Sequence, residues 1–215
     1  MKLPLQNRVS PFGDIIATQA RGTLTGNRGI IHDPDTRRLL PRRRWSSRAW
    51  IYCRCDFKNR KRDVFGRNGR NGGPGWTNLF FLDEATALAA GHRPCFYCQR
   101  TRANEFKAAW ESAFGRWPGV QAVDAVLHAQ RLNSGQKRLH RLPPRLPKGV
   151  MLALGANAFT HIDEHWFQWH ASGYEKADTF DPEQTMLITP PAITKTILAG
   201  FSPKVADMMV SGDHR

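Results

Sequence analysis

Residues 79–98 read LFFLDEATALAAGHRPCFYC, and this stretch contains the clearest local signals in the chain. The apolar run at residues 79–82 predicts a short strand, because aromatic and aliphatic side chains favour extended backbone. Asp83 is a good N-cap, and Gly91 is a good C-terminal stop, for the alanine-rich helix expected between them. The stretch therefore predicts a strand, a helix and then a turn that begins at Cys95.

The four cysteines of the chain form two close pairs, Cys53 with Cys55 and Cys95 with Cys98. Paired cysteines on tight turns suit the tetrahedral thiolate site of a structural zinc ion, which is the cofactor that we expect. The second pair has the usual spacing of two residues, whereas the first pair encloses only one. His92 is therefore an alternative fourth ligand. The other interpretation is that the four cysteines are buried or free thiols of an intracellular protein.

The region before this stretch is predicted to be extended and rich in turns. Short extended pieces are expected at residues 15–18 and 29–32, and no helix is evident in the first forty residues. Residues 45–57 alternate apolar and polar side chains over part of their length, which predicts a strand or hairpin that carries the first cysteine pair. Residues 66–75 are a loop rich in Gly, Asn and Arg.

The region after this stretch is predicted to contain helices and an antiparallel sheet. Apolar residues recur on one helical face at residues 104–114 and again at residues 120–132. A basic stretch with two adjacent prolines, residues 133–148, follows. Strands of a meander are then expected at residues 150–154, 159–162 and 165–169, with a turn at Asp163 and Glu164. Prolines at the start and a glycine at the end predict a final helix that begins near Pro190 and stops at Gly200.

These elements predict an α+β fold, in which a small four-cysteine zinc-binding module packs with helices and a short antiparallel sheet. The length of 215 residues is sufficient for a substantial core. We expect a basic N-terminal region at residues 1–115, with the zinc-binding module at about residues 45–102. A C-terminal region of helices and antiparallel strands, residues 116–215, is expected to pack with it as one globular unit.

The chain is strongly basic, with a formal net charge of +14, and the charge is concentrated. Residues 37–70 contain thirteen Lys or Arg and only two acidic residues. Such a patch favours a polyanionic partner, and nucleic acid is the first candidate, with DNA preferred to RNA. Arginine can contact phosphate with two parallel donors, and an exposed aromatic ring can stack on an unpaired base. The predicted contact residues are Arg42, Arg43, Arg44, Trp45, Arg48, Arg54, Lys58, Arg60, Lys61, Arg62 and Arg93. The alternatives are a solvated basic face and, for Trp45 and Trp50, positions in the core.

Three segments resemble the zinc-binding domain of the Ada family of DNA alkylation-repair regulators. They are Tyr52-Cys53, LFFLDEA at residues 79–85 and AAGHRPCFYC at residues 89–98; in the family an aromatic-Cys start is followed by Ala-Gly-aromatic-Arg-Pro-Cys-x-x-Cys. The resemblance implies a zinc site made by Cys53, Cys55, Cys95 and Cys98, and contact with DNA. It also places Cys53 where the family's first zinc cysteine accepts a methyl group from a DNA phosphotriester.

The chain departs from the Ada pattern outside these segments. The family spaces its first cysteine pair by three residues where this chain has one, and the loop between the pairs is longer here. The sequence contains neither the Pro-Cys-His-Arg alkyl-acceptor motif nor a helix-turn-helix activator region. The resemblance, confined to about residues 50–100, therefore implies zinc and DNA contact more directly than methyl transfer.

An enzymatic interpretation rests on Asp124, His128 and Arg131, which would share one face of the helix at residues 120–132. A carboxylate that orients an imidazole beside an arginine can activate water next to a phosphate, which is the chemistry of a phosphodiester hydrolase. The alternative is a solvated, ion-paired face. A late cluster could likewise bind a metal or simply form turns and strand edges: His161, Asp163, Glu164, His165 and His170.

The sequence thus predicts a zinc-binding, nucleic-acid-binding protein concerned with DNA repair or processing. A second hypothesis is a zinc-supported enzyme on nucleic acid, either a hydrolase or an alkyl acceptor at Cys53, and a third is a zinc-stabilised scaffold for a protein or RNA partner. No nucleophile elbow, HExxH helix or deaminase signature identifies a reaction. Neither a secretory signal nor a membrane span is evident, so we expect a cytoplasmic protein.

Overall fold

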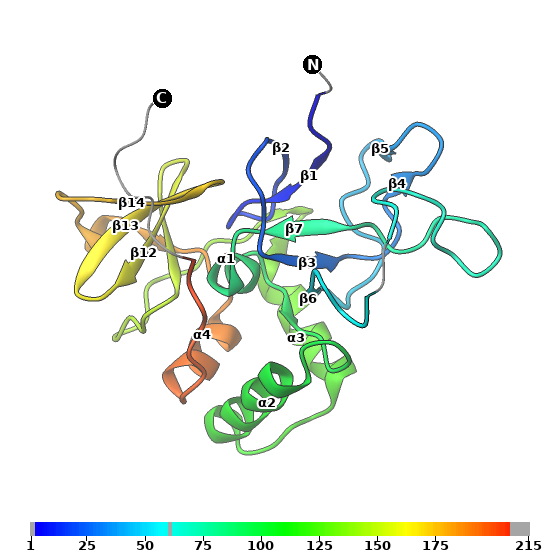
Figure 1. Cartoon of the computed structure of the whole chain (residues 1–215). Coiled ribbons are helices and arrows are strands. Elements are labelled where there is room, and N and C mark those ends of the chain that lie inside the picture. Colours follow the sequence, from blue (N-terminus) through cyan, green and yellow to red (C-terminus); the bar gives the residue numbers. More distant parts are fainter. Residues whose placement is uncertain (1–2, 60–61, 207–215) are drawn as a thin grey trace.

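The computed structural model describes residues 3–59 and 62–206, and it has an α+β architecture, as predicted. Two β-sheets lie side by side with helix α1 between them, and three further helices lie along one side of the pair (Figure 1). Arg60 and Lys61, two of the predicted contact residues, lie outside the described residues. Among the residues that are described, no helix is long and apolar enough to cross a membrane.

The first sheet has six strands in the order β2-β1-β7-β3-β6-β8. Most neighbours are antiparallel, but β1 with β7 and β6 with β8 are parallel pairs. Its strands are β1 Gln6–Val9, β2 Ile15–Ala17, β3 Leu24–Asn27, β6 Ile51–Arg54, β7 Leu79–Phe81 and β8 Arg93–Pro94. The predicted strand at residues 79–82 is confirmed, and it occupies a central position in the sheet.

The second sheet is an antiparallel meander in the order β14-β13-β12-β11-β15. The three strands expected there are confirmed, and Asp163 and Glu164 form the turn between two of them with φ of 43° and 70°. The five strands are β11 Met151–Leu154, β12 Asn157–Ile162, β13 His165–His170, β14 Gly173–Lys176 and β15 Met186–Leu187. Two short hairpins complete the strands: β4 His32–Asp33 with β5 Arg38–Leu39, and β9 Leu132–Asn133 with β10 Gln136–Lys137.

The helices begin and end close to their sequence signals. Helix α1 spans Glu84–Ala89, with the Asp83 side chain accepting a hydrogen bond from the Thr86 amide, and Gly91 follows it with φ of 86°. The other helices are α2 Arg100–Phe114, α3 Val120–Arg131 and α4 Pro191–Leu198, with a 3-10 turn at Pro182–Gln184. All three predicted later helices are present, although α2 begins four residues earlier than the 104–114 pattern indicated.

The predictions of extended structure at residues 29–32 and 45–57 are wrong over most of these segments. At residues 29–32 only His32 lies in a strand, because Gly29 adopts φ of 93° and the Ile31 amide donates to the Thr77 hydroxyl instead of to a neighbouring strand. At residues 45–57 only Ile51–Arg54 is a strand. The amides of Ser46 and Ser47 both donate to the Arg28 carbonyl, which holds this part as a loop.

The core lies between the helices and the two sheets. One hydrophobic cluster joins side chains of the first sheet, such as Tyr52 and Phe81, to Phe106, Leu127 and Leu152. These residues come from both sides of residue 115, so the N-terminal and C-terminal regions share this cluster. Trp50 is buried at 2% exposure, which favours the core interpretation for this residue, whereas Trp45 is 39% exposed.

Candidate metal centre and the cysteine pocket

Three cysteine sulfurs meet at the edge of the first sheet. Cys53 lies in β6, and Cys95 and Cys98 lie in the turn between β8 and α2. The sulfur atoms of all three lie within 4.8 Å of one another. The parallel pairing of β6 with β8 produces this arrangement, because it lets the Cys95 amide donate to the Tyr52 carbonyl at 3.0 Å.

The three thiols interact directly with one another. Hydrogen bonds from Cys53 and Cys98, and from backbone amides in the turn, hold the pKa of Cys95 well below its ordinary value. Hydrogen bonding to Cys95 and Cys98 raises the pKa of Cys53 in turn. Three thiols that interact in this way, with ionisation of Cys95 favoured, are a donor set that suits a thiophilic divalent cation. A zinc ion bonds thiolate sulfur at about 2.3 Å, which separates the sulfurs of a tetrahedral site by roughly 3.8 Å. The observed cluster therefore fits zinc after a small contraction.

Cys55 does not belong to this cluster, contrary to the four-cysteine prediction. Its side chain is exposed, and its thiol donates to the Thr23 carbonyl at 3.4 Å. Cys55 follows the last residue of β6, Arg54, and its hydrogen bond to Thr23 accounts for its separation from the other three sulfurs.

His92 is not a ligand in the described structure either. It is fully buried, it accepts a hydrogen bond from Arg28 Nε at 3.3 Å, and its ring packs against Phe81 and Trp50. Burial and the nearby Arg28 and Arg131 lower the pKa of His92 far below its ordinary value, so this imidazole is neutral at physiological pH. His92 belongs to the core beside the metal centre.

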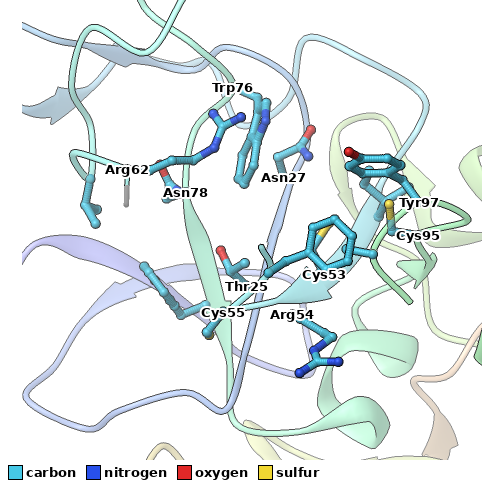
Figure 2. A pocket seen from close by; sticks show the side chains of 15 residues that line it. Thr25, Asn27, Cys53, Arg54, Cys55, Arg62, Trp76, Asn78, Cys95 and Tyr97 are labelled. Atoms are coloured by element: carbon cyan, nitrogen blue, oxygen red, sulfur yellow. The ribbon is translucent and has the colours of Figure 1, made fainter. Parts of the chain in front are cut away.

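A pocket of about 480 Å³, here called the cysteine pocket, opens beside the three sulfurs. Thr25, Cys53 and Phe80 are cross-strand neighbours on one face of the first sheet, and this face forms the floor of the pocket. Figure 2 shows the Arg62 guanidinium beside the Trp76 ring and Tyr97 close to Cys95. The lining combines sulfur, aromatic rings, amides and two arginines: Cys53, Cys55, Cys95, Cys98, Phe57, Trp76, Phe80, Tyr97, Asn27, Asn78, Thr25, Arg54, Arg62, Ile51 and Val64.

Asn78 is the most distinctive polar group of this pocket. The residue is only 5% exposed, and its side-chain oxygen has no hydrogen-bond partner among the described residues. A buried amide oxygen without a partner costs free energy, so such an atom points to a ligand or an ordered water. Asn78 immediately precedes β7 and lies outside the apolar run at residues 79–82 that predicted the strand, so the sequence held no local signal for it.

The predicted nucleic-acid contacts divide into two groups. Arg54, Lys58 and Arg62 surround the cysteine pocket; Arg62 stacks over Trp76 at 4.3 Å, and Lys58 contacts the Tyr97 hydroxyl at 3.5 Å. The other group is exposed on the loop between β5 and β6: Arg42, Arg43, Arg44, Trp45 and Arg48. This positive surface is consistent with a polyanionic partner but does not by itself identify one.

Arg93 is not available for nucleic acid. It is 6% exposed and forms two hydrogen bonds of 2.8 Å with the carboxylate of Asp124, which is also buried. This bidentate pair fastens α3 to β8, next to the cysteine turn. The helical spacing of Asp124 thus has a structural explanation.

The proposed hydrolase arrangement is therefore not assembled. Asp124 is engaged with Arg93, so it does not orient His128. The His128 ring instead lies 3.3 Å from the Arg131 guanidinium and packs edge-on against the ring of Trp45. Arg131 is fully buried and donates to the carbonyls of Gly91 and Arg48. The helical face that we expected to act on solvent is turned into the core.

The late histidine cluster does not form a metal site within the described ranges. His170 faces Glu175 at 3.2 Å, Asp163 faces Lys148 at 3.6 Å, and the His161 ring packs on Trp166. Across residues 3–59 and 62–206, the three cysteines form the one group of candidate metal ligands that lie close enough together.

Comparison with protein-family models, curated proteins and solved structures finds no match to this chain. The resemblance to the Ada family therefore rests on residues 52–98 alone and stays a prediction.

Proposed function

We propose that this protein binds a zinc ion through Cys53, Cys95 and Cys98 and holds nucleic acid over the adjoining pocket. The observation that carries this proposal is the position of the three-sulfur cluster, which lines the same pocket as several aromatic rings and two arginines. The pocket's volume of about 480 Å³ is in the range of small-ligand sites.

Zinc with three thiolate ligands has one coordination position left. Cys55 lines the same pocket, but its thiol donates to the Thr23 carbonyl, so we do not expect it to fill that position. A water molecule or a bound ligand is the alternative, as in zinc sites with an open position. Bound zinc would supply structural support for the turn between β8 and α2, and it would keep the three thiolates ionised at neutral pH.

The rim of the pocket suits an unpaired nucleotide. Arg54, Lys58 and Arg62 provide positive charge for the backbone, while Trp76 and Tyr97 provide rings on which a base can stack. Asn78 offers to a base edge an amide oxygen that has no partner among residues 3–59 and 62–206. These features favour a single strand or an everted base over an undistorted duplex, and the Ada resemblance favours DNA over RNA.

A second candidate function is alkyl transfer to Cys53, because this cysteine lines the pocket while its sulfur lies in the metal cluster. The Cys53 thiolate would attack the methyl carbon of a phosphotriester, the methyl C–O bond would break, and the phosphodiester would leave with the electron pair. Mass spectrometry of protein incubated with a methylphosphotriester oligonucleotide would test this step. A mass gain of one methylene group that is lost in Cys53→Ser is the expected result.

The main proposal is tested by metal content and by salt-dependent binding. Purified protein should contain one equivalent of zinc by elemental analysis. The triple variant Arg54→Ala/Lys58→Ala/Arg62→Ala should weaken binding of labelled single-stranded DNA and reduce the salt slope of the affinity by about 2, since each phosphate contact on a single strand contributes roughly 0.7.

A matched control replaces Arg141, Arg145 and Lys195 by alanine, which removes the same charge outside the cysteine pocket. Equal loss of affinity in the two triple variants would show that binding follows net charge alone and would contradict a site at this pocket. Protein that folds normally without metal would contradict the zinc centre.

A further inference from the structure

A second pocket, of about 340 Å³, is lined by three cations that are not exposed on the surface. Arg28 follows β3, Arg131 ends α3 and Lys137 lies in β10, so three separate elements bring these charges to one place. Asp14 is the one carboxylate in the lining. We call this the cation pocket, and its three inner cations are Arg28, Arg131 and Lys137.

Arg28 is buried with part of its guanidinium unused. The residue is 1% exposed, and it donates from Nη1 to the Gly13 carbonyl at 2.8 Å and from Nε to His92 at 3.3 Å. Its Nη2 has no hydrogen-bond partner within the described residues. Its Cζ lies 3.9 Å from the centre of the Trp50 ring. A charged donor that is buried and unpaired is costly, so this nitrogen points to an acceptor that is not part of the chain.

Arg131, like Arg28, is buried with one guanidinium nitrogen that makes no hydrogen bond to the described residues. It donates to the carbonyls of Gly91 and Arg48, while its buried Nε has no partner among the residues described. Its Cζ lies 4.1 Å from the centre of the same Trp50 ring. Two guanidinium groups therefore share one indole ring. Asp14 lies near Arg28 and Asp124 near Arg131, but neither carboxylate forms an ion pair with them among the described residues.

Lys137 adds a third positive charge to the same space. Its ammonium donates to the Ala89 carbonyl, at the end of α1. None of the three cations forms an ion pair with an acidic side chain in the described part of the chain, whereas the buried Arg93 is paired with Asp124. Burial and the proximity of Arg28 and Arg131 lower the pKa of Lys137 to about 7. Burial also lowers the pKa of Arg28 and that of Arg131 to about 9 each.

The cations could have a purely architectural role, because they donate to loop carbonyls and pack on Trp50. That role does not need three formal charges, since a neutral donor would satisfy a carbonyl without the penalty of burying an unpaired charge. The three inner cations and the exposed Arg44 face a single carboxylate, Asp14, around one cavity, and this excess of positive charge suits a phosphate dianion.

We propose that the cation pocket binds a phosphate group, carried either by a small molecule or by the end of a nucleic-acid strand. Guanidinium groups bind phosphate with parallel donors, and the ammonium adds a point charge. Arg44 and the exposed ring of Trp45 also line the pocket and face whatever group the phosphate carries. The proposal does not depend on zinc or on the cysteine pocket.

The first experiment measures the melting temperature of the full chain with inorganic phosphate, against sodium chloride at equal ionic strength. Phosphate should raise the melting temperature by several degrees in a saturable manner, because a ligand of the folded state alone stabilises it. The effect should vanish in Lys137→Met, which keeps the length of the side chain, and persist in the neighbouring exposed control Arg138→Met. No saturable shift, or an equal shift in both variants, would overturn the proposal.

A second readout tests whether the charge of Lys137 has an architectural role. Without phosphate, Lys137→Met should melt no lower than wild type, because it removes an unpaired charge. A large fall in the melting temperature of Lys137→Met would show that the charge has an architectural role and would overturn the proposal.

The source of the phosphate is distinguished with oligodeoxynucleotides that differ only in a 5′-phosphate. If the site takes a strand end, the phosphorylated form should bind wild type about tenfold more tightly or better, and Lys137→Met should lose this preference. If inorganic phosphate binds and the two oligonucleotides are equivalent, the site takes a small-molecule phosphate. Both outcomes support a phosphate site, whereas an absence of both effects contradicts it.

Discussion

Residues that are adjacent in the chain, at the end of β3 and at the start of β6, line different pockets. Asn27 and Ile51 line the cysteine pocket, whereas Arg28 and Trp50, each one position away, line the cation pocket. Successive side chains of extended backbone point to opposite faces, so two adjoining segments contribute to two sites. In the cysteine pocket the positive charge lies at the rim, where water solvates it. In the cation pocket it is buried, where solvation is lost.

This difference separates two ways in which a protein can present positive charge. Rim arginines cost little in the free protein, and they add affinity that salt weakens. Buried, unpaired cations destabilise the free protein and strengthen the binding of an anion that replaces their lost solvation. Arg93 is the internal reference, because it is also buried but is neutralised by Asp124.

The largest expected effect is on the metal centre. Cys95→Ser should lose most of the bound zinc and lower the free energy of unfolding by at least about 3 kcal/mol, a fraction of the roughly 10 kcal/mol known for finger peptides that have no other core. Urea denaturation with and without a chelator measures this change. Cys55→Ser is the matched control and should keep both zinc and stability. If the two variants behave alike, the distinction between these cysteines is wrong.

The second largest effect is expected for the buried ion pair of Arg93 with Asp124. Arg93→Met should lower the free energy of unfolding by about 3 to 5 kcal/mol, because it leaves the buried carboxylate of Asp124 without a partner. Arg93→Met/Asp124→Leu should recover most of that loss in the same denaturation experiment. Lys137→Met removes a cation that has no such partner, so its effect should be small or stabilising. Equal losses in Arg93→Met and Lys137→Met would remove the contrast between paired and unpaired cations.

Only some elements of the fold could be predicted from the sequence. The strand at residues 79–82, the Asp83 cap, the Gly91 stop and the meander were all predictable, because capping and period-2 patterns are local. Strands β1 and β3 were missed because QNRV and LTGN are short and largely polar. Strand β3 pairs with β6 and β7, and β1 pairs with β7 as well as with its neighbour β2; pairing over the longer distances leaves no local pattern.

The functional sites were also only partly predictable from the sequence. The spacing of Cys95 and Cys98 predicted a metal turn, but the Cys-x-Cys spacing did not reveal that the Cys55 thiol would bond to the Thr23 carbonyl, apart from Cys53. The face of α3 that carries Asp124 and Arg131 looked like a catalytic surface, because helical spacing does not tell which face is buried. Arg28 gave no signal at all, since nothing local distinguishes a buried arginine from one in a solvated patch.

A smaller effect is the pH dependence of anion binding. The pKa of Lys137 is lowered to about 7, and the groups that face it are Arg28, Arg131, Asp14 and the neutral His92. Because a bound dianion raises the pKa of Lys137, binding above pH 7 must take up a proton. The affinity for sulfate, which does not titrate here, should therefore be constant below about pH 7 and fall by up to about tenfold per pH unit above it.

Isothermal titration with sulfate at about one-unit steps above pH 7 measures this slope, and Lys137→Met should give weak binding with no slope. In the absence of a ligand, the folding stability depends on pH in the opposite sense, because it rises as pH rises. A lysine with a lowered pKa in the folded state destabilises the protein most below pH 7, and this penalty disappears as pH rises towards the ordinary value of 10.5. A sulfate affinity that is independent of pH in the wild type would exclude Lys137 from the site.

The smallest expected effect separates two asparagines of the cysteine pocket. The Asn27 side-chain oxygen accepts a hydrogen bond from the Gly29 amide, whereas the Asn78 oxygen has no partner in the described structure. Asn78→Leu should therefore leave the free energy of unfolding unchanged or raise it by up to about 1 kcal/mol, while Asn27→Leu should lower it by about 1 to 2 kcal/mol. Single-stranded DNA should bind Asn78→Leu several-fold more weakly, because the lost acceptor serves the ligand alone. A loss of stability in Asn78→Leu with unchanged DNA affinity would assign this amide to the fold and not to the site.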